Sequence, residues 1–171
     1  MIQTNTKTEK QPISEILQKK REALITRFIN GEAPDFPRKH ARFLDDYFCE
    51  SFVTSRIGPH IGLSRNPYAI IALGGYCRQE QCVHSDVDLL FLFGKYVPDQ
   101  AEELIREVVY PLWDIGLDVG YATRSVKECI SLASRDFEIL TPMLDARFIC
   151  GWSLIYSELM DQVRQKIIGK K

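Results

Sequence analysis

Two acidic residues separated by one position stand between two apolar runs and close to a pair of glycines. Asp86 and Asp88 come just before the run Leu89–Phe93, and Gly74–Gly75 follow the run Tyr68–Leu73. Both runs have the length and composition of buried strands, so we expect a strand–turn–strand unit. Because alternate residues of a strand share a face, the two carboxylates should project to the same side.

Carboxylates held this close together repel each other unless a cation lies between them. Magnesium is a hard ion that binds carboxylate and phosphate oxygens. The glycine pair lets backbone amides approach a phosphate closely. Asp86 and Asp88 are therefore predicted to bind magnesium at a site that handles phosphate groups. The alternative is an Asp-x-Asp pair that only caps a strand or faces solvent.

The segment around these acids resembles the signature of the polymerase β-like nucleotidyltransferases, and most closely the N-terminal transferase domain of the bacterial PII uridylyltransferases. That family typically has G-G-Y-G-R-G-E and then, after a few variable residues, S-D-I-D-L-L. The positions of this chain that share its residue types and spacing are Gly74, Gly75, Tyr76, Arg78, Glu80, Ser85, Asp86, Asp88, Leu89 and Leu90. Further blocks follow in the same order at Pro111–Gly120, with Arg124 after it, and at Leu144–Gly151.

The resemblance implies a polymerase β-like nucleotidyltransferase fold with a two-metal magnesium site. Two metal ions ~3.5–4 Å apart stabilise the attacking and leaving oxygens in such chemistry. The implied metal ligands and catalytic residues are Asp86, Asp88 and Asp118, the last on a third predicted strand over 117–123. Asp114 is the rival third acid, but it lies at a predicted helix end, where capping or an ion pair is the simpler role.

The nucleotide-binding residues that the resemblance implies are Gly74, Gly75, Arg78, Ser85 and Arg124. Arg78 is suited to phosphates because a guanidinium pairs well with them, although an ion pair with Glu80 is the alternative. Ser85 is expected to bond either a phosphate oxygen or its own turn. Arg124 is expected either to contact the nucleotide or to support the acids.

Two positions of the glycine segment depart from the family pattern. Cys77 and Gln79 stand where the family usually has glycine. If the backbone there needs a positive φ, each side chain costs roughly 1 kcal/mol or more. Tyr121 and Ala122 also replace the polar pair common in the family's third strand. These departures keep open a nucleotide-binding or docking module that has lost turnover.

Enzymes of this family use UTP and magnesium to attach UMP to a tyrosine of the trimeric signal protein PII, and the resemblance implies the same partners here. An adenylyltransferase or another nucleotidyltransferase acting on a different protein is the second enzyme hypothesis. The family normally continues into an HD-type hydrolase domain and glutamine-sensing ACT domains. Because this sequence has no His-Asp dipeptide, it is expected to be an excised domain or a short member.

The composition is that of one globular domain with a real core. The 171 residues are 45% hydrophobic, and 22 Lys and Arg balance 23 Asp and Glu, which makes a nucleic-acid partner improbable. No run approaches the ~20 apolar residues of a membrane span, and the polar N-terminus lacks a signal-peptide core. A cytoplasmic location is expected. The irregularly spaced cysteines predict free thiols, and His40, His60 and His84 are expected at the surface or in caps.

Hydrophobic periodicity predicts an α/β architecture of the α+β kind, with a small mixed sheet flanked by helices. Ser14, Asp136 and Ser153 are predicted to cap helices, and Ser125 with Glu128 to form a capping box. The expected divisions are a flexible tail at 1–12, an N-terminal helical segment at 13–58, the catalytic core at 66–152, and a C-terminal helix and tail at 153–171.

Overall fold

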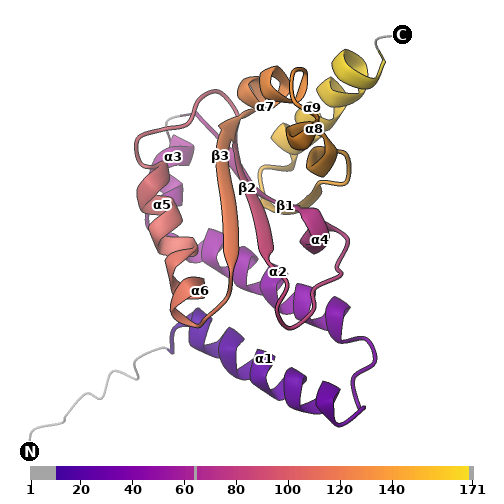
Figure 1. Cartoon of the computed structure of the whole chain (residues 1–171). Helices are drawn as coiled ribbons and strands as arrows, with labels where there is room; N and C mark the ends of the chain where they lie inside the picture. Colours follow the sequence, from indigo (N-terminus) through magenta and orange to yellow (C-terminus); the bar gives the residue numbers. More distant parts are fainter. Residues whose placement is uncertain (1–10, 64, 170–171) are drawn as a thin grey trace, which may run out of the picture.

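A four-stranded sheet lies between two layers of helices in this protein. The computed structural model describes residues 11–63 and 65–169 (Figure 1). The sheet has the order β3-β2-β1-β4 and consists of β1 (Tyr68–Leu73), β2 (Val87–Phe93), β3 (Val119–Ser125) and β4 (Arg147–Gly151). The predicted α+β architecture with a mixed sheet is confirmed. Most of the expected tail at 1–12, and residues 170–171 of the C-terminal tail, lie outside the described residues.

Strand β2 is antiparallel to β1 and parallel to β3, whereas β4 is antiparallel to β1. A parallel pair needs a crossover connection. The helices α5 (Ala101–Val108) and α6 (Tyr110–Asp114) provide it. The antiparallel connection from β1 to β2 contains one turn of helix, α4 (Gly74–Cys77), followed by the loop 78–86. The glycine turn predicted from the sequence is therefore a short helix.

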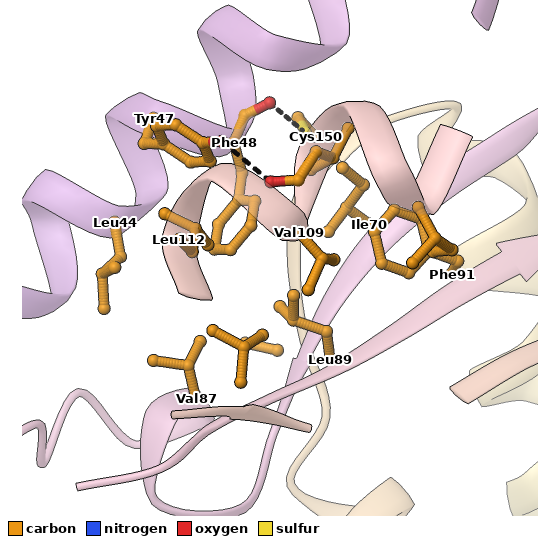
Figure 2. Close-up of a cluster of buried hydrophobic side chains, with 14 of the residues drawn as sticks. Leu44, Tyr47, Phe48, Ile70, Val87, Leu89, Phe91, Val109, Leu112 and Cys150 are labelled. Carbon is orange, nitrogen blue, oxygen red and sulfur yellow. Dashed lines mark hydrogen bonds between the residues drawn. The ribbon is translucent and has the colours of Figure 1, made fainter. Parts of the chain in front are cut away.

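Each face of the sheet has its own apolar core. The first core joins the odd-numbered residues of β2 to α1 (Ile13–Ile29), α2 (Phe36–Thr54), α5 and α6. Figure 2 shows the part of this core that contains Phe48 of α2, Leu89 of β2 and Leu112 of α6. The second joins Leu90 and Leu92 to α7 (Val126–Ala133), α8 (Phe137–Leu144) and α9 (Ser153–Val163). Strands covered on both faces are apolar almost throughout, which explains the continuous runs in the sequence.

Helix starts follow local chemistry only in part. The capping box of Ser125 and Glu128 is confirmed, and the Asp136 carboxylate accepts the N–H of Glu138 at 2.8 Å. The predicted caps at Ser14 and Ser153 are wrong, because both residues lie inside their helices and no side chain caps either helix. The remaining helical segments are α3 (Gly58–Leu63) and a π-helical turn over Arg164–Ile168. No helix among the described residues is long and apolar enough to cross a membrane.

A partly buried ionic network ties α4 to α2 and β4. The Arg147 guanidinium donates Nη1 and Nη2 to the two carboxylate oxygens of Asp45, at 2.9 and 3.1 Å, and its Nε to the Cys77 carbonyl at 3.0 Å. The fully buried Tyr76 donates its hydroxyl to the same carboxylate at 2.6 Å. Burial, together with the charge of Asp45, holds the pKa of Tyr76 well above its usual value, so this hydroxyl remains a donor.

Removing the cation from this network should destabilise the fold. The side chains of Arg147 and Asp45 are 26% and 21% exposed, so neither charge is fully solvated without its partner. We expect Arg147→Met to lower the free energy of unfolding by about 2–4 kcal/mol, and Asp45→Asn to cost less in that background than alone. Urea unfolding of the single and double variants measures this coupling. Strictly additive losses would contradict it.

Candidate active site

The acids of the motif meet at one end of the sheet, where β2 and β3 begin. Asp86 and Asp118 immediately precede these two strands, and the N–H of Val87 donates to the Asp118 carbonyl at 2.9 Å. Asp88 lies opposite Gly120 in the parallel register. Because the strands are parallel and alternate residues share a face, the three acids belong to one face at one end of the sheet.

Asp88 is the acid on which this arrangement acts most strongly. Partial burial raises the pKa of its carboxyl, and the negative charges of Asp86 and Asp118 raise it further. The rival acid Asp114 is the last residue of α6 and is not among the charges that raise this pKa. Within the described part of the chain, none of the three carboxylates has a hydrogen bond or an ion pair. The site therefore gathers negative charge that is not paired with a cation among the described residues.

Two glycines leave the space that the Asp88 carboxylate occupies. A Cβ atom on Gly74 would lie 2.5 Å from Asp88 Oδ2, and one on Gly120 would lie 3.1 Å from Oδ1. Gly74 also has a φ of +58°, a conformation that residues with a side chain rarely adopt. Gly75 differs, because nothing lies within 4 Å of the position of its Cβ. The space beside the Cα of Gly75 is therefore open.

The two adjacent glycines should respond differently to substitution. Gly74→Ala places a methyl group against Asp88 in a left-handed backbone, so we expect it to lose roughly 1–3 kcal/mol of unfolding free energy. Gly75→Ala meets open space and should stay within about 0.5 kcal/mol of the wild type. Urea unfolding of the two variants side by side checks this difference. Equal losses of unfolding free energy would contradict the close contact between Gly74 and the Asp88 carboxylate.

A cavity of about 410 Å³ extends from Asp88 along this face of the sheet. The strands contribute Leu90, Gly120, Ala122 and Arg124, and helix α8 contributes Glu138, Ile139, Pro142 and Met143. This volume lies within the ~300–1,000 Å³ typical of small-molecule sites. An apolar floor with an acid at one end and charged side chains on the wall suits a ligand that has a flat ring and a charged tail.

The predicted nucleotide-binding residues are only partly brought together. Gly74 and Arg124 line the cavity, whereas Gly75, Arg78 and Ser85 do not. The guanidinium of Arg78 pairs instead with Glu80 at 2.9 Å, and the Ser85 hydroxyl accepts the N–H of Cys82 at 3.1 Å. Both residues therefore take the alternative roles in this structure, and their contacts with a nucleotide stay predictions.

The four cavity residues of α8 were missed by the sequence analysis. Neither composition nor spacing in α8 signals a ligand, because these side chains reach the site only through the packing of α8 on the second core.

Buried side chains of the N-terminal helices hold the loop that leads to Asp86. The fully buried Gln81 donates its amide to the Asp86 carbonyl at 3.0 Å, and Arg21 donates to the Val83 carbonyl at 2.6 Å. His40 Nδ1 lies 3.3 Å from the Gln81 carbonyl and must carry the proton, because a carbonyl only accepts. Burial lowers the pKa of His40, so its ring stays neutral. The expected surface or capping role of His40 is wrong, because its side chain is fully buried and faces the Gln81 carbonyl, far away in the sequence.

Only one of the two departures from the glycine pattern carries the predicted backbone cost. Gln79 has a φ of +59°, in the region that favours glycine. Cys77 lies within the α4 turn, and its thiol donates to the Gly74 carbonyl at 2.8 Å. The loop therefore keeps the left-handed turn at Gln79 despite its side chain.

The charged oxygens of the site do not form a closed metal cage. Among the described residues, no three His, Cys, Asp or Glu side chains lie close enough together to form a ready set of metal ligands. The three acids nevertheless interact, since Asp86 and Asp118 both raise the pKa of Asp88. Carboxylates that share a face but remain separated can hold a hard cation that brings its other oxygen ligands with it.

Neutralising Asp88 should stabilise the protein in the absence of ligand. When folding raises the pKa of a carboxyl, ionising that carboxyl destabilises the folded protein. For Asp88 this penalty is present at pH 7 and disappears below the ordinary pKa of 3.8. We expect Asp88→Asn to gain up to about 1 kcal/mol at pH 7, a size limited by solvent screening. Asp114→Asn is the matched control and should gain nothing. A less stable Asp88→Asn protein at pH 7 would count against repulsion among the acids.

An α+β sheet with a glycine turn after its first strand and three acids at one end is consistent with a nucleotidyltransferase fold. Comparison with known proteins shows similarity to two enzymes of the same name. The chain is 40% identical over 99 residues to the bifunctional uridylyltransferase/uridylyl-removing enzyme of Rhodopseudomonas palustris. It is 44% identical over 91 residues to the enzyme of the same name from Cereibacter sphaeroides.

These matches confirm the resemblance inferred from the motifs and support a nucleotidyltransferase. They cover 58% and 53% of this chain, but only 11% and 10% of the two relatives. The chain thus spans about a tenth of the length of the curated relatives that it matches. No family model matches the chain.

Proposed function

We propose that this chain is a magnesium-dependent nucleotidyltransferase domain that transfers UMP from UTP to a tyrosine of a PII-type signal protein. The observation that carries the proposal is the set of three acids, Asp86, Asp88 and Asp118, beside a cavity of nucleotide size. No ion pair joins these acids to a cation in the part of the chain that the structure describes. The similarity to uridylyltransferases supports the choice of uridine.

The donor set fits magnesium in particular. Carboxylate oxygens are hard ligands, and magnesium usually keeps waters and substrate phosphates in its shell rather than sitting in an all-protein cage. Asp86, Asp88 and Asp118 would hold it, and the open arrangement of these acids leaves room for the triphosphate. When bound, magnesium supplies positive charge that stabilises the attacking and leaving oxygens.

The chain's own residues account for the rest of the reaction. The tyrosine oxygen attacks the α-phosphorus of UTP, a new P–O bond forms, and the bond to the β-phosphate breaks so that pyrophosphate leaves. Asp118, at the outer strand, accepts the proton of the tyrosine hydroxyl. The backbone at Gly75 contacts the phosphates, Arg124 offers them a cation, and the apolar cavity floor holds the nucleoside.

A non-catalytic nucleotide-binding module is the second candidate. Two observations favour it: the left-handed Gln79, and the ion pair that occupies Arg78. An adenylyltransferase that acts on a different protein keeps the same acids and differs in the nucleotide and the acceptor. These functions share the site and differ in which label is transferred and to what.

Transfer of labelled nucleotide separates these functions. We expect labelled UMP to appear on a purified PII-type protein in the presence of UTP and magnesium, and to fall at least 100-fold in Asp86→Asn and Asp88→Asn, because each variant removes a metal ligand. Asp114→Asn is the matched control and should retain activity. Labelling from ATP would change the nucleotide. Magnesium-dependent UTP binding without labelling would favour the non-catalytic module.

A further inference from the structure

Three aromatic side chains form an exposed cluster beside the outermost strand. Tyr110 and Trp113 of α6 stack with ring centroids 4.9 Å apart, and the ring of Tyr121 on β3 lies 6.2 Å from Trp113. They are 40%, 41% and 43% exposed, respectively. The indole N–H of Trp113 donates to the Val119 carbonyl at 3.1 Å, which fixes the cluster to β3. We call these three residues the aromatic patch.

A patch of this composition has the properties of a binding surface. Tyrosine and tryptophan are enriched among the residues that contribute most to protein interfaces, and they lose little conformational entropy when they are already fixed. Arg106, whose guanidinium pairs with Glu102 at 2.7 Å, also interacts with the Tyr110 hydroxyl and gives the rim charged side chains of both signs. A preformed aromatic surface with a charged rim fits a protein segment better than a phosphate backbone.

The strand that carries Tyr121 also has an unpaired edge. The Asp118 carbonyl faces β2, so the odd-numbered residues of β3 direct their N–H and C=O groups the other way. The outward carbonyl of Val119 already accepts the hydrogen bond from the Trp113 indole. The outward groups of Tyr121 and Thr123 have no hydrogen bond within the described ranges. A free strand edge of this kind accepts an extended segment as an additional strand.

The patch and the acids lie on opposite faces of the same edge strand. Tyr121 packs beside Phe91 on the first face, whereas Gly120 abuts Asp88 on the second. Successive side chains of an extended segment also point to opposite faces. A segment added to β3 would therefore direct one side chain onto the aromatic patch and the next across Gly120 toward Asp88. The absence of a side chain at Gly120 leaves that path open.

We propose that the free edge of β3, together with the aromatic patch, is the docking surface for the acceptor protein. The acceptor adds an extended loop to β3, so that an apolar side chain packs on Trp113 and Tyr121 while the adjacent tyrosine hydroxyl reaches Asp88 and Asp118. This inference rests on the proposed transfer to a protein tyrosine. The acceptor is favoured over other occupants because only a segment that must reach the acids gains from both faces of the strand.

The test measures docking separately from turnover. The equilibrium Kd of a fluorescently labelled PII-type protein is determined by anisotropy, and the KM for this acceptor and for UTP by labelling. Tyr110→Ala removes part of the patch without touching the residues that line the nucleotide cavity, and Thr123→Pro removes an outward N–H at an edge position where proline is tolerated. We expect each to raise the acceptor Kd and KM at least tenfold, with kcat at saturating acceptor and the KM for UTP within twofold.

Trp152→Ala is the matched control, because Trp152 is 53% exposed and lies at the start of α9. It should leave both acceptor constants unchanged. If Thr123→Pro does not fold, as judged by thermal unfolding, Tyr110→Ala carries the test. Wild-type binding that both variants preserve would overturn the docking surface and leave the proposed function standing. Failure of the wild type to bind, or a dimer that Tyr110→Ala dissociates, would also overturn it. The labelling experiment decides the function independently.

Discussion

The ion pair between Arg147 and Asp45 holds together the segments from which the site is built. It joins β4 to α2 across 102 residues of sequence, and through Tyr76 and the Cys77 carbonyl it fixes the short helix that begins at Gly74. Gly74 in turn forms one side of the space that the Asp88 carboxylate fills. The position of Asp88, the acid that lines the cavity, thus depends on a charge pair between α2 and β4.

The site itself opposes folding. Three like charges meet at the start of β2 and β3, and partial burial raises the cost of ionising Asp88. Such repulsion is tolerated where a ligand relieves it, because a cation that binds the folded protein stabilises it. The buried Gln81, held by His40, fixes the loop before Asp86 against this repulsion. The N-terminal helices are therefore part of the scaffold of the site, although no side chain of theirs reaches the cavity.

Three properties of strand β3 follow from its place in the sheet. It is an edge of the sheet, it begins immediately after Asp118, and it runs parallel to the strand that carries Asp88. A parallel partner brings the beginnings of both strands to one end, and an edge position leaves one row of backbone groups unpaired. The crossover through α5 and α6 is what places Tyr110 and Trp113 beside this edge.

The sequence by itself determined the local parts of this protein. The runs before and after the glycine pair specified β1 and β2, Asp86 and Asp88 had to share a face, and Ser125 with Glu128 specified a helix start, since each depends only on near neighbours. The family resemblance had already favoured Asp118 over Asp114, and the structure shows Asp118 acting on Asp88. Only the tertiary structure decided that α8 forms the cavity wall and that His40 is buried. Those outcomes depend on contacts between residues far apart in the chain, where strand order and helix packing, rather than residue type or spacing, decide which groups meet.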